Sequence, residues 1–111
     1  MDKTHLVPPS ERTYGLEHIA IGSDVRVSLQ SFAEDQHVPW HYHSEITDTF
    51  ICIEGKLLVQ QADEADVVLA PGERFDIAPG VHHRVASADG NPCRSILIQG
   101  VGRADFLRVD P

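Results

Sequence analysis

The chain has 111 residues, which is enough for one domain with a core of its own. Lys and Arg total 9 against 17 Asp and Glu, and the formal net charge of -8 argues against nucleic acid or an anionic membrane as a partner. The first residues lack the apolar core of a signal peptide, and no run of about 18 apolar residues occurs. Two cysteines, Cys52 and Cys93, are too few for a disulfide framework. We therefore expect a cytoplasmic protein with reduced thiols.

The chain begins with a stretch of mixed charge that contains two adjacent prolines. This stretch, residues 1–13, predicts an N-terminal arm or a lead-in strand, followed by a single domain over residues 14–111. Residues 25–30 then alternate between apolar and polar side chains, which is the pattern of a strand with one buried face.

Turn signals divide the remaining chain into short strands. Proline–glycine pairs at 71–72 and 79–80 suit type II turns, and Asp63-Glu64 predicts a hairpin connection. The strands that the patterns indicate cover residues 16–21, 25–30, 49–53, 56–62, 65–70, 74–77, 95–99 and 104–109. No stretch keeps the apolar spacing of a helix. Many short strands at such intervals indicate an all-β sandwich or barrel, and a double-sheet jelly roll fits this pattern.

One strand is apolar on both of its faces. Phe50 and Cys52 share one face of residues 49–53, and Ile51 and Ile53 share the other. A small barrel has no second layer of its own to cover the outer face, so we expect a homodimer that packs outer sheet faces together.

Histidines and acidic residues concentrate between Pro39 and Gly55. His41 and His43 are two positions apart, so a strand places both imidazoles on one face, and the carboxylates of Glu45 and Asp48 follow within reach. Imidazole and carboxylate together suit a divalent transition metal ion, namely Mn, Fe, Co, Ni, Cu or Zn.

A third imidazole comes from His82-His83, which follows the turn at Pro79-Gly80. Neighbours in a strand point to opposite faces, so only one of the two histidines can join the earlier pair. His83 shares parity with the apolar Val85, whereas His82 shares parity with Arg84, which is costly to bury unpaired. We therefore expect His83 to point inward and His82 outward.

These residues resemble the two motifs of the cupin family. The first motif reads Gly-x5-His-x-His-x3/4-Glu-x6-Gly, and His41, His43, Asp48 and Gly55 follow its spacing. The second reads Gly-x5-Pro-x-Gly-x2-His-x3-Asn, and residues 72–87 follow it with Gly72, Gly80 and His83 in place. The resemblance covers residues 35–87. It implies a double-stranded β-helix, or jelly-roll barrel, with His41, His43, Asp48 and His83 as metal ligands.

The chain departs from the family pattern at four positions. Asp48 stands in place of Glu, Asp35 in place of the first Gly, Ser87 in place of Asn, and Pro79 lies one position late. Asp is one methylene shorter than Glu, so the backbone lies closer, Glu45 takes the place of Asp48, or the metal keeps three protein ligands and more water.

The expected function follows from this site. We expect a small metal-dependent enzyme, dioxygenase-like or isomerase- or lyase-like, that acts on a small oxygen-bearing organic molecule. Glu45 is the candidate proton carrier. The alternative is a non-catalytic cupin that binds or senses a small molecule. A sugar-nucleotide isomerase or epimerase is disfavoured because the chain is acidic and phosphates require basic residues.

Overall fold

The computed structural model describes residues 14–109, so the arm or lead-in strand expected over residues 1–13 lies outside it. Ten strands occur in the described part, and no helix. The strands are β1 (Gly15–Ile21), β2 (Val25–Phe32), β3 (His37–Tyr42), β4 (Thr47–Glu54), β5 (Leu57–Gln61), β6 (Val67–Leu69), β7 (Arg74–Ile77), β8 (His83–Ser87), β9 (Cys93–Gly100) and β10 (Leu107–Arg108). A helix able to cross a membrane is accordingly absent from residues 14–109.

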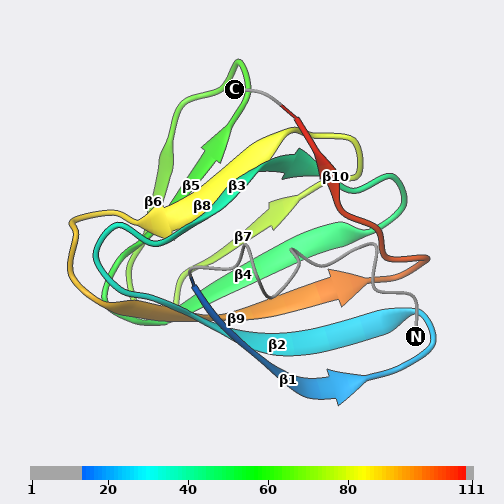
Figure 1. Cartoon of the computed structure of the whole chain (residues 1–111), viewed down its shortest axis with the longest axis horizontal. Coiled ribbons are helices and arrows are strands. Elements are labelled where there is room, and N and C mark those ends of the chain that lie inside the picture. The colour runs from blue at the N-terminus through cyan, green and yellow to red at the C-terminus, as the bar shows by residue number, and fades with distance from the viewer. Residues whose placement is uncertain (1–13, 110–111) are drawn as a thin grey trace.

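The strands form two five-stranded sheets that face each other (Figure 1). The first sheet has the order β1-β2-β9-β4-β7 and the second has the order β10-β3-β8-β5-β6. Every pairing is antiparallel, and the chain crosses repeatedly from one sheet to the other. The predicted all-β jelly-roll architecture is confirmed.

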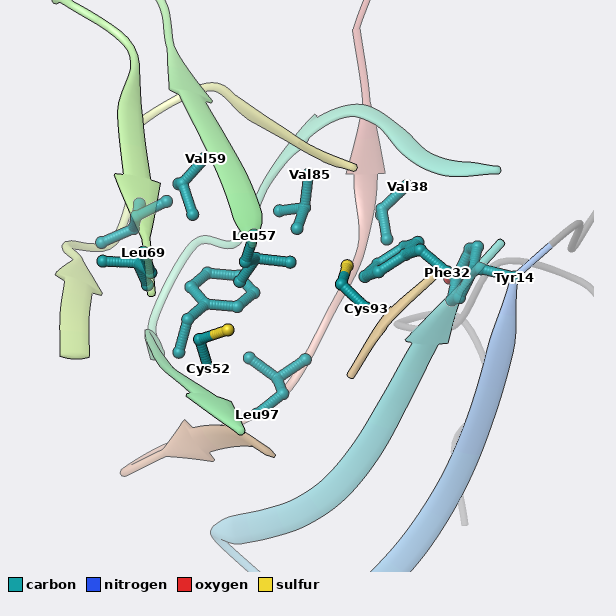
Figure 2. Packing of buried hydrophobic residues seen from close by; sticks show 12 residues of the cluster. Tyr14, Phe32, Val38, Cys52, Leu57, Val59, Leu69, Val85, Cys93 and Leu97 are labelled. Atoms are coloured by element: carbon teal, nitrogen blue, oxygen red, sulfur yellow. The ribbon is translucent and has the colours of Figure 1, made fainter. Parts of the chain in front are cut away.

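Apolar side chains from both sheets fill one end of the space between them (Figure 2). Phe50 and Cys52 point inward from β4, and Leu57 and Val59 meet them from β5. Cys52 and Cys93 are buried free thiols in this core. Burial raises the pKa of the Cys93 thiol to about 11, so this group is unreactive at neutral pH.

The polar face of β2 is the one that points inward. Arg26, Ser28 and Gln30 are buried, whereas Val27 and Leu29 lie on the outer face and are half-buried. The predicted alternation is therefore present, but the interior near these strands is polar. Judged by hydrophobicity alone, Val27 and Leu29 would be expected to point inward. They point outward because the barrel interior near β2 contains buried polar side chains.

An irregularity in β3 changes which of its residues face inward. The register with β8 shifts between Val38 and His41, where Pro39 cannot donate to the ladder. As a result Val38 and His41 are both buried although they are three positions apart. His37, which has the same sequence parity as His41, lies half-buried on the other side.

The C-terminal strand is shorter than its pattern indicates. Residues 104–109 are the expected strand, but only Leu107–Arg108 pair with β3. The preceding residues leave β9 and run across the end of the barrel, where the Gly102 N–H donates to the Asp24 carbonyl (2.9 Å). This crossing segment, residues 101–106, carries backbone and side-chain contacts to the site described below.

Candidate metal centre

Three histidines and one aspartate from distant parts of the chain meet between the sheets. His41 lies in β3, His43 follows that strand directly, Asp48 lies in β4, and His83 begins β8. All four are buried, and one ligand atom from each lies within 4.8 Å of the others. His41 and His83 are cross-strand partners, so the pairing of β3 with β8 brings their rings together.

Each of the three histidines donates from its Nδ1 atom to a backbone carbonyl. The pairs are His41 with Pro39 (2.7 Å), His83 with Val81 (2.8 Å) and His43 with Asp105. A carbonyl oxygen only accepts, so Nδ1 carries the proton and the neutral ring has its lone pair on Nε2. Histidines that coordinate metal ions through Nε2 are held in this way.

Asp48 faces two of these rings. Its Oδ2 atom lies 3.0 Å from His43 Nε2 and 2.9 Å from His83 Nε2. Since Nδ1 holds the proton of each neutral ring, Nε2 has none to donate, and two lone pairs would face a negative oxygen. A positive charge between these atoms, either a proton on a ring or a metal ion, relieves the repulsion.

The dimensions of the group also fit a first-row metal ion. Bonds from such an ion to imidazole nitrogen or carboxylate oxygen are about 2 Å long, so ligands on opposite sides of it lie about 4 Å apart. The 4.8 Å limit found here therefore needs shifts of less than about 1 Å. Three imidazoles and one carboxylate form a donor set that such ions accept.

The surroundings of the group place Asp48 in its ionised form. Burial raises the pKa of Asp48, but the hydrogen bonds that His43 and His83 donate from Nε2 when their rings are protonated outweigh this effect and hold the pKa well below its usual value. Burial also lowers the pKa of His43, but the hydrogen bond to Asp48 outweighs it and raises the pKa above the usual value. Burial and the neighbouring imidazoles lower the pKa of His41 well below its usual value, which keeps that ring neutral.

A row of buried polar side chains extends from Asp48 across the first sheet. Asp48, Gln99 and Arg26 are opposed positions on β4, β9 and β2. Gln99 Nε2 donates to Asp48 Oδ1 (3.1 Å), and Arg26 Nη2 donates to Gln99 Oε1 (3.2 Å). Gln99 therefore holds one carboxylate oxygen and leaves the other facing the histidines. Sequence reasoning missed this row, although polar residues at alternate positions of β2 signalled it.

The crossing segment supplies two further contacts that the sequence did not reveal. The Phe106 ring stacks on the His41 ring, with centroids 4.1 Å apart and an angle of 13°. The Asp105 carboxylate accepts hydrogen bonds from the backbone N–H and the hydroxyl of Ser44, and its carbonyl accepts from His43. The segment thus covers the group from the open end and fixes the loop after β3.

The other residues considered from the sequence lie outside the group. Glu45 is exposed beside Gly102, and its role as proton carrier stays a prediction. His82 is exposed and stacks on Tyr42, with ring centroids 4.8 Å apart. His18, a histidine not singled out above, is half-buried and forms a hydrogen bond with the buried Ser28 on the inner face of the first sheet (2.9 Å).

Gln99 lines two cavities. The smaller, of about 20 Å³, reaches His41 and Asp48 and has room for about one water molecule. The larger, of about 520 Å³, lies between the β1–β2 turn and residues 102–104 of the crossing segment. Arg26 and Gln99 line this larger cavity.

The chain belongs to the cupin family. Residues 28–99, well over half of the chain, match the cupin domain family, and the resemblance seen in the two motifs is confirmed. The match spans the strands from β2 to β9 that carry all four residues of the group. No curated protein is significantly similar to the chain in sequence.

Solved structures share the fold over most of the chain. A conserved, uncharacterized protein with a double-stranded β-helix domain from Klebsiella pneumoniae is 19% identical, with a TM-score of 0.78 over 96% of this chain and 92% of that one. A cupin-2 domain-containing protein from Shewanella frigidimarina is 26% identical, with a TM-score of 0.66 over 78% and 79%. An RmlC-like cupin from Methanocaldococcus jannaschii is 14% identical, with a TM-score of 0.72 over 92% and 93%.

Proposed function

We propose that this cupin is a metal-dependent enzyme that acts on a small oxygen-bearing organic molecule. Its single divalent transition metal ion is held by His41, His43, Asp48 and His83. One observation carries the proposal: three imidazoles, each fixed by a carbonyl at Nδ1, gather around one ionised carboxylate, and the Nε2 atoms of two of them, His43 and His83, face its Oδ2 atom. Such an arrangement is stable with a cation at its centre and repulsive without one.

The residues around the group support this function. A bound divalent ion would polarise a carbonyl or enolate oxygen of the substrate, or activate dioxygen beside a chelated substrate. Asp48 offsets part of the charge of the ion, and Gln99 orients its carboxylate. Phe106 covers His41 and excludes water from that side of the group. Glu45, at the surface beside the crossing segment, is the proposed proton carrier.

Metal binding is tested with two neighbouring histidines. His83→Ala removes a buried member of the group, whereas His82→Ala removes its exposed neighbour and serves as the matched control. We expect protein purified without chelator to hold about one metal equivalent by elemental analysis, His82→Ala to match it, and His83→Ala to bind more than about 100-fold more weakly. Equal metal content in both variants would contradict the proposal.

Catalysis is tested separately from metal binding. The metal-loaded protein is assayed for oxygen uptake and product formation with a panel of diketones, catechols and thiols. We expect turnover by the wild type and none by His41→Ala, because His41 is a ligand. Turnover that survives in His41→Ala would show that the group is not the active centre.

One observation favours the alternative of a non-catalytic binding cupin. The cavity that reaches the histidines has a volume of only about 20 Å³, which admits about one water molecule rather than a substrate. Saturable binding of a small molecule to the metal-loaded protein, without conversion of that molecule, would favour this alternative over the enzyme.

We also propose a cytoplasmic location. Cys52 and Cys93 are neighbouring buried thiols that are not joined in a disulfide, which suits a reducing compartment. Fractionation of cells that express the tagged full chain tests this location.

A further inference from the structure

Arg26 is a buried cation that donates a side-chain hydrogen bond to a neutral amide. Its side chain is 5% exposed, and Nη2 donates to Gln99 Oε1 (3.2 Å). The Nε atom has no hydrogen-bond partner within residues 14–109, and no carboxylate in that part of the chain forms an ion pair with Arg26. A guanidinium in such surroundings is unfavourable unless an anion reaches it.

Asp48 does not serve as that anion. Gln99 stands between the two side chains and separates Arg26 from the Asp48 carboxylate. Burial lowers the pKa of Arg26, and the negative charge of Asp48 only partly offsets this effect. When a metal ion occupies the group, its positive charge compensates Asp48 and leaves the guanidinium without a counter-charge.

Arg26 borders a cavity with the size and charge to hold a small anion. Its volume is about 520 Å³, within the range of small-molecule sites. Arg26 and Arg103 line it together with one acidic residue, Asp24, so two of its three charged lining residues are cationic. The nearby Asp105 carboxylate offsets part of the charge of Arg103. The whole chain has a formal net charge of -8, so this local excess runs against the general surface.

We propose that this cavity binds a small organic carboxylate and that the Arg26 guanidinium is the group that recognises it. The planar fork of a guanidinium matches the two oxygens of a carboxylate, and the Nε–H of Arg26 has no partner in the described part of the chain. The bound ligand would then lie against Gln99, one side chain away from Asp48. That this carboxylate is the substrate rests on the function proposed above, whereas the anion site itself needs no metal.

The test measures binding of malonate, with malonamide as its neutral counterpart and inorganic phosphate as a competing anion. Titrations of the full chain, followed by calorimetry and by amide shifts of residues 22–26 and 102–104, are made with and without metal. Arg26→Gln removes the cation, Arg26→Lys keeps the charge without the planar fork, and Arg94→Gln is the matched control because Arg94 is exposed on β9.

We expect malonate, but not malonamide, to bind wild type and Arg94→Gln alike. We expect affinity to fall about tenfold or more in Arg26→Gln and by a smaller factor in Arg26→Lys. Because the guanidinium has no anionic partner in the free protein, Arg26→Gln should lower the melting temperature by no more than about 4 °C. If Arg26→Gln does not fold, two other measurements test whether Arg26 binds malonate. They are the affinity of Arg26→Lys and the shift of the NMR signal of the Arg26 Nε–H in the wild type when malonate is added.

Four results would overturn the proposal. They are no binding of malonate, equal binding of malonamide, unchanged binding in a folded Arg26→Gln or Arg26→Lys, and a preference for phosphate. Malonate binding that disappears with the metal and ignores Arg26 would place the anion on the metal ion instead. Metal content is measured on the same samples, so failure of the metal centre and failure of the anion site are distinguishable.

Discussion

Asp48 is the residue on which the candidate metal centre depends most. Its two carboxylate oxygens have different partners: Oδ1 accepts from Gln99, and Oδ2 faces His43 and His83. The position is 2% exposed, so bulk water does not hydrate this carboxylate and its partners within the protein matter more. The short aspartate side chain still reaches the imidazoles, because its strand, β4, lies opposite the ends of β3 and β8.

The affinity for metal should depend on pH through His43. The pKa of His43 is raised, so in the metal-free protein a proton occupies Nε2 at higher pH than in a free histidine. Metal must displace that proton, so we expect affinity to fall by about tenfold per pH unit as pH drops below this raised pKa. Asp48, whose pKa is held well below its usual value, stays ionised throughout and adds no proton. Calorimetric titrations with Zn between pH 8 and pH 5 measure the slope.

The variant Asp48→Asn provides the control for this pH dependence. It removes the hydrogen bond and the charge that raise the pKa of His43, so the fall in affinity should move to lower pH while affinity weakens overall. An affinity that does not change with pH in the wild type, or an identical profile in the variant, would argue against the role given to the His43–Asp48 pair.

At the scale of elements, strand pairing together with local irregularities of the backbone sets the positions of the four residues of the candidate centre. The register shift in β3 turns His41 inward, and His43 lies in the loop after that strand. The turn at Pro79-Gly80 brings His83 to the start of β8, and the Gly80 N–H donates to the His43 carbonyl (2.7 Å). The crossing segment then closes over these rings.

The turn between β4 and β5 connects the two sheets and leaves little room for a side chain at Gly55. Gly55 has a φ of +73°, and a Cβ atom there would lie 2.5 Å from the Pro92 carbonyl oxygen. Gly72 has a φ of +90° but open space around it, so it is the matched control. We expect Gly72→Ala to cost about 1 kcal/mol for the backbone conformation. Gly55→Ala should cost about 1–3 kcal/mol more for the clash.

Chemical denaturation of both variants measures the free energy of unfolding and so separates the two contributions. Equal decreases in the free energy of unfolding would mean that the chain around Pro92 moves aside easily. The close approach at Gly55 would then not contribute to stability.

At the scale of the whole molecule, the first sheet is partly polar on its inner face and apolar on much of its outer face. Its inner face carries the polar row from Arg26 to Asp48, and its outer face carries half-buried apolar side chains on three adjacent strands. Cross-strand register joins Leu29, Ile96 and Ile51 into one apolar row, and Val27 pairs with Ile98 beside it. Ile19 and Ile53 add exposed apolar area on the same sheet, at 58% and 43% exposure.

We propose that a second copy of the chain covers this outer face. A contiguous apolar face on a sheet is self-complementary about a two-fold axis, as in most homodimers. Ile98→Glu should therefore convert a dimer into a monomer of 12.3 kDa. Val68→Glu changes an exposed apolar residue on the other sheet and should leave the dimer intact. Sedimentation at micromolar concentration reports the mass, and a monomeric wild type would refute the proposal.

Local sequence determined much of this architecture. Turn residues and alternating side chains indicated most strands within a few positions, and β7 matches its predicted range of 74–77, because these signals depend on near neighbours. The spacing of His41, His43 and Asp48, with a distant His83 after a proline–glycine turn, was enough to nominate the residues that the structure brings together.

Tertiary structure alone decided the rest, because it depends on residues that are far apart in the chain. Which face of β2 points inward follows from Arg26 meeting Gln99, which is 73 positions away. The carbonyl of Asp105 fixes the tautomer of His43 across 62 positions, and the ring of Phe106 covers His41 from the same segment. Local sequence patterns do not predict such contacts between residues that are far apart in the chain. They arise only when two sheets pack and each buried polar group must find a partner.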